Sequence, residues 1–120
     1  MSGEESRIHL TSVGVGTYWY LPPECFNFKS GRTPQISTKV DVWSIGVIYF
    51  QMLYNRKPFG NDMSQNEVFS QNVILNAHKV NFPNKPNISQ ESKEFIKNCL
   101  KYYQEDRYDV FEAFNKINSF

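Results

Sequence analysis

The sequence has 120 residues, 40% hydrophobic and 21% charged, a composition typical of one globular domain rather than of a disordered or fibrous chain. A net charge of +1, with no basic run, disfavours nucleic acid as an electrostatic partner. No apolar stretch is long enough to span a membrane, and Cys25 and Cys99 lie too far apart in sequence for a Cys-x-x-Cys metal or redox motif.

The first 16 residues show neither a helical nor a strand-like apolar period, and Gly14 and Gly16 interrupt them, so they predict a flexible loop. The chain opens on an acidic, polar segment unlike a signal peptide. Together with two cysteines read as reduced and buried, this predicts an intracellular protein. Pro22 and Pro23 then predict the first turn of a short helix that ends before Gly31.

The clearest predicted element is a helix from Lys39 to Tyr54, with Thr38 as its N-cap, Asp41 as the acid of a capping box and Asn55 at its end. Between Val40 and Tyr54 few side chains are strongly polar, namely Asp41, Ser44 and Gln51. A helix that is apolar around most of its circumference is buried on several sides.

Three more helices are predicted, each with a polar cap. The pair Ser64 and Glu67 starts a helix to about Ala77, and Ser89 caps the next one. That helix has an apolar face of Phe95, Ile96, Cys99 and Leu100, and a last helix opened by Asp109 and Glu112 carries Val110, Phe111, Phe114 and Ile117. Strand signals are weak, the best being 79–82, so the predicted fold is mainly α, with about five helices and little or no sheet.

The residues by themselves predict no catalytic or binding motif. His9 and His78 have no Ser/Asp or Cys/Asn arrangement that would predict a catalytic triad. The Gly14-Val15-Gly16 segment would need a third glycine where Trp19 stands to predict a phosphate-binding loop. From these residues we predict no catalytic residue, no bound cofactor and no metal site in this chain.

Four segments in order nevertheless resemble the protein kinases. The segment 16–24, Gly-Thr-Tyr-Trp-Tyr-Leu-Pro-Pro-Glu, is similar to the end of the kinase activation segment, and 41–47, Asp-Val-Trp-Ser-Ile-Gly-Val, to the start of the central helix of the large lobe. Pro58-Phe59 and then Cys99-Leu100 with Asp106-Arg107 follow at the family's approximate spacings. The amino-acid sequence of these segments resembles the tousled-like serine/threonine kinases in particular, and the resemblance runs from about Thr11 to the C-terminus. Pro22 in place of the usual Ala agrees with that group.

The resemblance implies roles for several residues. Glu24 and Arg107 would form a buried ion pair that ties the activation segment to the last helices. Asp41 would accept hydrogen bonds from the catalytic loop, which is absent here; alternatively it serves only its own helix N-terminus. Thr17 would reach the catalytic aspartate of a Ser/Thr kinase.

Further roles concern the substrate and the activation loop. Tyr18, Trp19 and Tyr20 would line the floor under the residue that follows the phosphoacceptor, although simple packing explains Tyr20 equally well. Thr11 and Ser12 stand where the family places activation-loop phosphorylation. Residues 1–16 would then be the remnant of the activation loop and 17–120 the helical part of the kinase large lobe, an incomplete domain.

The motifs that hold ATP and Mg²⁺ in kinases are not found in this sequence: Gly-x-Gly-x-x-Gly, Val-Ala-Ile-Lys, His-Arg-Asp and Asp-Phe-Gly. The resemblance therefore implies an ATP- and Mg²⁺-dependent Ser/Thr kinase as the parent protein, and an inactive fragment in this chain. The alternative is a natural, non-catalytic kinase lobe that acts as an interaction module. Expected partners are a protein substrate, the remainder of the kinase domain and, through exposed core surface, a second copy of the chain. By resemblance alone the parent is nuclear and its substrate is a histone chaperone.

Overall fold

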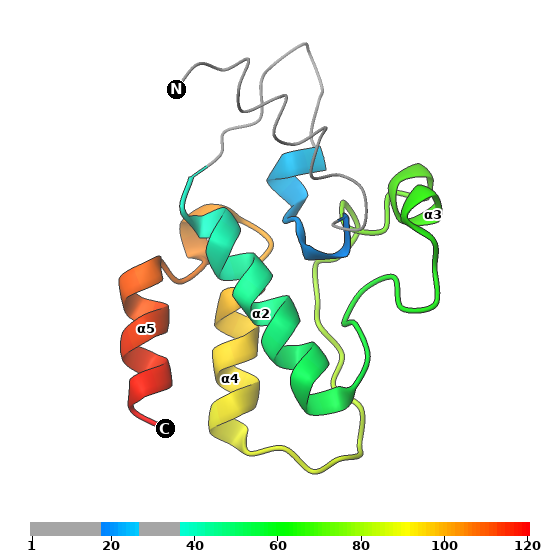
Figure 1. The fold of residues 1–120 in the computed structure, drawn as a ribbon. Helices are drawn as coiled ribbons and strands as arrows, with labels where there is room; N and C mark the ends of the chain where they lie inside the picture. Colours follow the sequence, from blue (N-terminus) through cyan, green and yellow to red (C-terminus); the bar gives the residue numbers. More distant parts are fainter. Residues whose placement is uncertain (1–17, 27–36) are drawn as a thin grey trace.

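The structure is a computed structural model that describes residues 18–26 and 37–120. These residues form helices joined by loops, and no strand occurs among them (Figure 1). The elements are two 3-10 helices, η1 (Tyr18–Tyr20) and η2 (Pro23–Phe26), followed by α2 (Lys39–Tyr54), α3 (Gln65–Ser70), α4 (Gln90–Cys99), the 3-10 helix η4 (Gln104–Asp106) and α5 (Val110–Asn118). The predicted mainly helical fold is confirmed.

Helix α2 is the element around which the others pack, with contacts to α4, α5 and η1 (Figure 1). Two neighbouring stripes of its surface are buried. Val42 joins Phe95, Cys99 and Ala113 in a small cluster between α2, α4 and α5. Trp43, Val47, Phe50 and Tyr54 belong to the larger cluster, which η2, α4 and the loop after α3 complete. The helix thus separates two hydrophobic clusters.

A third stripe of α2 is exposed in the described part of the chain. Ile45, Ile48 and Met52 are 37%, 48% and 76% exposed, and their spacing places them on one face of the helix. The sequence predicted burial on several sides, and this face has no cover among residues 18–26 and 37–120. Helix α5 is similar, because it buries Ala113 while Phe111 and Phe114 are largely exposed.

The predicted caps are largely confirmed. Both capping boxes are present, Ser64 with Glu67 and Asp109 with Glu112, and the Ser89 hydroxyl accepts a hydrogen bond from the Ser92 N–H. The predicted cap of α2 is confirmed in its position but not in its side-chain contact. Thr38 already has helical backbone angles and its side chain makes no cap hydrogen bond; the Ser37 hydroxyl accepts from the Lys39 N–H instead, at 3.2 Å.

The end of α3 is a second correction. The sequence predicted a helix to about Ala77, but α3 ends at Ser70 and turns follow it. Asn72 has a left-handed φ of 53°, which Asn tolerates better than most residues and which ends the regular hydrogen-bond pattern. The change of direction brings Ile74 to 1% exposure in the larger cluster. The chain thus turns and buries Ile74 instead of continuing the helix.

The short helix predicted after Pro22 is present as the 3-10 turn η2, in which Pro23, Cys25 and Phe26 are buried. The predicted loop at 1–16 and the end of that helix before Gly31 lie outside the described residues. The weak strand signal at 79–82 corresponds to irregular chain, with no strand partner among the residues described.

A substitution at Gly46 tests how closely α2 and α4 pack. A Cβ at this position would lie 2.7 Å from the Cys99 Cβ and 2.9 Å from a Leu100 methyl group. Because the Cys99 Cβ is fixed to its backbone, we expect Gly46→Ala to lower the free energy of unfolding by about 2 kcal/mol, overpacking outweighing the better helix propensity of Ala. Urea denaturation measures this, and Met52→Ala on the exposed face of α2 is the control, with a change within about 0.5 kcal/mol. Equal stability of the two variants would contradict the close packing.

Candidate functional site

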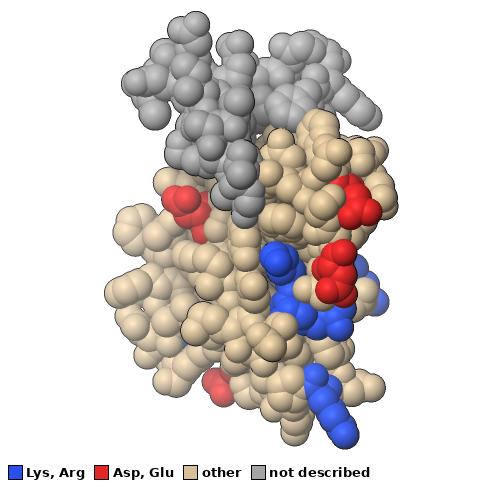
Figure 2. Space-filling view, turned by 45° about the vertical axis from the view of Figure 1, so that its right-hand side comes forward, with Lys and Arg blue, Asp and Glu red and all other residues tan. Residues whose placement is uncertain are grey.

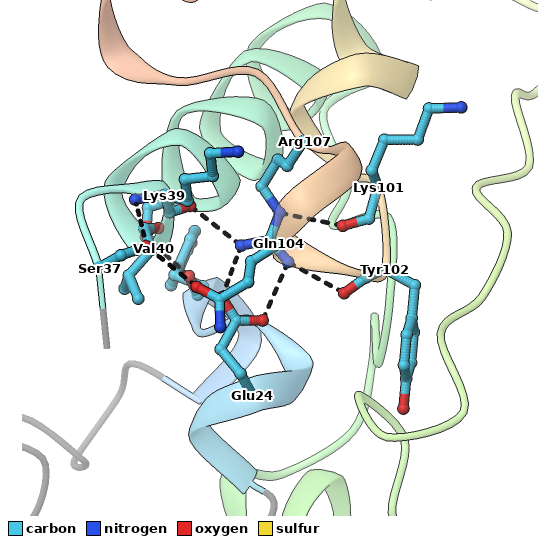
Figure 3. A network of polar contacts seen from close by, with 10 residues as sticks. Glu24, Ser37, Lys39, Val40, Lys101, Tyr102, Gln104 and Arg107 are labelled. Carbon is cyan, nitrogen blue, oxygen red and sulfur yellow. Dashed lines mark hydrogen bonds and ion pairs between the residues drawn. The ribbon is translucent and has the colours of Figure 1, made fainter. Parts of the chain in front are cut away.

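The first part of the site is a buried ion pair between η2 and the residue that follows η4. The Arg107 guanidinium donates to both carboxylate oxygens of Glu24, with Nη1–Oε2 at 2.7 Å and Nη2–Oε1 at 2.9 Å (Figure 3). The Arg107 side chain is fully buried and that of Glu24 is 12% exposed. The two residues are 83 positions apart in sequence, so the ion pair that the sequence predicted is a tertiary contact that joins the two ends of the described chain.

The rest of the guanidinium binds backbone carbonyl groups. Nε donates to the carbonyl of Lys101, Nη1 to that of Lys39 and Nη2 to that of Tyr102, at 2.9 to 3.0 Å (Figure 3). All five N–H groups of Arg107 therefore have acceptors. The group also lies 5.1 Å above the Trp43 ring. One side chain thus holds η2, the first turn of α2 and the loop before η4 together.

The second part of the site is η1, whose three aromatic residues are each fixed by a polar contact. The Tyr18 N–H donates to Gln65 Oε1 of α3 at 3.0 Å, and the Trp19 indole N–H donates to the Gly60 carbonyl at 3.0 Å. The Tyr20 hydroxyl donates to Gln51 Oε1 of α2 at 2.7 Å. As a result η1 is attached to two helices and to the turn between them.

Ser44 adds a further contact from α2, because its hydroxyl donates to the Tyr20 carbonyl at 2.7 Å. Ser44 and Gln51 are seven residues apart, so they lie on the same face of the helix. The sequence shows both as polar residues in an otherwise apolar helix, but no motif predicts a role for them. Two polar side chains at a helical spacing within an apolar helix are the signal that predicts a polar partner on that face.

Aromatic contacts complete the attachment of η1 to α3. The Tyr18 ring meets the Phe26 ring edge to face and the Phe69 ring at a tilt, each at a centroid distance of 5.7 Å. Phe69 is 47% exposed. Residues 18–20 are half-buried, so this aromatic surface remains accessible along its outer side.

The other predicted site residues are placed as follows. Asp41 lies exposed in the first turn of α2, a position that fits both of its predicted roles. Thr17, Thr11 and Ser12 lie outside the described residues. In the described ranges no group of three or more His, Cys, Asp or Glu side chains is placed to hold a metal ion, and no helix there is long and apolar enough to cross a membrane.

Both cysteines are buried next to this site. Burial raises the pKa of Cys25 to about 12, with the Glu24 carboxylate acting in the same direction and the Arg107 charge opposing it. Burial likewise raises the pKa of Cys99 to about 12, again opposed by Arg107. The two thiols are free and remain protonated at neutral pH, so they behave as apolar packing groups.

Comparison with known proteins adds a family to this geometry. The family model of the protein kinase domain matches residues 1–117. Serine/threonine-protein kinase tousled-like 1 of Homo sapiens is 58% identical over 106 residues, which are 88% of this chain and 14% of that protein. Serine/threonine-protein kinase TOUSLED of Arabidopsis thaliana is 55% identical over 104 residues, 86% of this chain and 15% of that protein. The chain therefore spans about one seventh of the length of these relatives.

The ion pair between Glu24 and Arg107 is expected to dominate stability. Glu24→Gln leaves the guanidinium buried without its counter-charge, which costs about 3 to 5 kcal/mol of unfolding free energy. The exposed pair between Lys97 and Glu94, with side chains about half exposed, provides the control, since Glu94→Gln is expected to cost at most about 0.5 kcal/mol. Urea denaturation of both variants at neutral pH measures the difference. Similar small losses in both would show that the buried pair does not hold the segments together.

The raised thiol pKa values predict an alkaline loss of stability. An unfolded thiol loses its proton near pH 9 while the folded one keeps it to about pH 12, so between these values the folded state binds more protons. Unfolding free energy should then fall by about 1.4 kcal/mol per pH unit for each thiol. Denaturation from pH 8 to 11 measures the slope, and Cys25→Ala and Cys99→Ala should each reduce it. An unchanged slope in both variants would assign the alkaline loss to other groups.

Proposed function

The chain belongs to the protein kinase family, and from that premise we propose that it is a part of the large lobe of a serine/threonine protein kinase. In this proposal the chain carries the end of the activation segment and the helices that dock a protein substrate. The observation that carries the proposal is the attachment of residues 18–26 to the helices, by the pair between Glu24 and Arg107 on one side and by the contacts of η1 on the other.

A substrate floor requires a segment that keeps its shape when a peptide binds to it. Four hydrogen bonds that involve side chains fix η1, and its three aromatic residues are half-buried. We propose that Tyr18, Trp19 and Tyr20 support the residue that follows the phosphoacceptor. Thr17, directly before them, would reach the catalytic aspartate supplied by the rest of the kinase, which favours Ser or Thr as the acceptor.

ATP and Mg²⁺ belong to the parent kinase in this proposal. The described residues offer no group of three acidic, His or Cys side chains for a metal ion, and the sequence has none of the kinase motifs that hold nucleotide. The chain by itself is therefore proposed to be inactive. The chain contributes substrate binding and support of the activation segment. Thr11 and Ser12 are the proposed phosphorylation sites, and Asp41 is proposed to accept hydrogen bonds from the catalytic loop.

The exposed apolar stripe of α2 favours a contact between this lobe and another protein segment. Ile45, Ile48 and Met52 form an apolar face on a helix that is buried on its other sides, and exposed apolar patches of this kind mark interaction surfaces. We propose that the remainder of the kinase domain covers this face in the parent protein. In the isolated chain the same face would associate two copies. A nuclear location and a histone chaperone as substrate rest on the resemblance to tousled-like kinases.

Titration calorimetry tests the proposal. The isolated chain is expected to give no heat with Mg²⁺ and ATP up to millimolar concentration, whereas the full-length kinase that contains it should bind nucleotide and phosphorylate Ser or Thr in a protein. Glu24→Gln in the full-length kinase should lower phosphorylation, and Glu94→Gln is the control that should not. Micromolar nucleotide binding by the isolated chain would overturn its assignment as a substrate-docking part. A full-length protein without kinase activity would favour the non-catalytic interaction module.

A further inference from the structure

Lys57 lies in the turn between α2 and α3, and the turn is fixed against η1. The Lys57 N–H donates to Asn61 Oδ1 at 3.1 Å, and the Gly60 carbonyl accepts from both the Met63 N–H and the Trp19 indole. Gly60 has a positive φ of 66°, and a Cβ there would lie 2.9 Å from Val68 and 3.2 Å from Trp19. The turn therefore packs directly on the indole ring and depends on a glycine.

This packing places a positive charge over the aromatic floor. The Lys57 ammonium group lies 4.8 Å from the centroid of the Trp19 ring, within the range of a cation–π contact. Such a contact orients the ammonium group but does not neutralise it, because the ring carries no net charge. Lys57 is half-buried, so its position is more restricted than that of a lysine that projects freely into solvent.

The charge of Lys57 has no counter-ion in residues 18–26 and 37–120. The ion pairs in this part of the chain join Lys97 to Glu94 and Arg107 to Glu24. Glu67 of the neighbouring α3 accepts from the Ser64 N–H in its capping box. The adjacent Arg56 is exposed and also unpaired within these residues. Figure 2 shows several Lys and Arg side chains close together on one face of the molecule, with acidic side chains beside them.

We propose that Lys57, assisted by Arg56, selects substrates with an anionic side chain directly after the phosphoacceptor Ser or Thr. This inference rests on the proposed function of η1 as the floor for that residue. An apolar floor alone would favour an apolar side chain, but an ammonium group held over the indole favours a carboxylate or a phosphate on the same site. Both anions satisfy the same chemistry, and the experiment distinguishes them.

The experiment uses the full-length kinase that contains this chain and peptides of equal length and charge. One peptide carries Asp directly after the acceptor Ser, and its isomer carries the Asp three positions before it. The kcat/KM of the first is expected to exceed that of the second by about 5-fold, the upper range for a partly exposed ion pair, and the difference should lie in KM. A third peptide with phosphoserine after the acceptor is expected to equal or exceed the Asp peptide.

Variants of Lys57 test whether this residue causes the preference for an anionic side chain. Lys57→Gln should reduce the ratio of kcat/KM between the two Asp isomers to near one, and Lys57→Arg should retain it because the charge remains. Lys116→Gln removes the same charge from the exposed surface of α5 and should leave the ratio unchanged. Higher salt should lower the ratio of the unsubstituted kinase.

The outcomes separate this inference from the function on which it rests. If neither peptide is phosphorylated, the proposed kinase function fails. If both Asp isomers are phosphorylated equally by the unsubstituted kinase and the phosphoserine peptide has no advantage over them, or if Lys57→Gln retains the preference, the anion selectivity is overturned while the kinase function stands. A preference for phosphoserine without one for Asp supports the anionic site and identifies phosphate as its source.

Discussion

Arg107 presents five N–H donors in a site that water does not reach. Any of these donors left without an acceptor would destabilise the folded state. The chain meets this demand with one carboxylate and three backbone carbonyls from three separate segments: η2, the first turn of α2, and the loop at residues 101 and 102. Hydrophobic packing of η2 with α2 also holds these segments together. The polar contacts between them meet at one planar cation, which a lysine would not reproduce because it lacks the rigid fork.

The pair between Glu24 and Arg107 fixes one end of residues 18–26, and a different kind of contact fixes the other. The contacts of η1 are neutral hydrogen bonds to Gln51, Gln65, Gly60 and Ser44, supported by aromatic packing on Phe26 and Phe69. They restrain the aromatic residues, which are half-buried. Residues 18–26 therefore combine a buried ion pair at one end with half-buried aromatic residues at the other.

The faces of α2 also differ in burial. The two buried stripes face α4, α5 and η2, while the stripe of Ile45, Ile48 and Met52 faces outward in the described part of the chain. An amphipathic surface helix would carry polar side chains on such a face. Apolar residues at these positions therefore favour the proposed contact of this face with another protein segment.

The sequence by itself determined the helices, because caps and apolar periodicity are local: the capping boxes at Ser64 and Asp109 and the Asn55 terminus appear where they were predicted. The resemblance of these motifs to the protein kinases also implied that Glu24 and Arg107 pair. Tertiary structure decided the rest. α3 ends at Ser70 because burying Ile74 requires a change of direction, and at the start of α2 the Ser37 hydroxyl, not the Thr38 side chain, accepts from the backbone. The position of the Lys57 ammonium over Trp19 depends on a turn packed against a segment 38 residues earlier in the chain, and no local pattern specifies a contact between residues that only folding brings together.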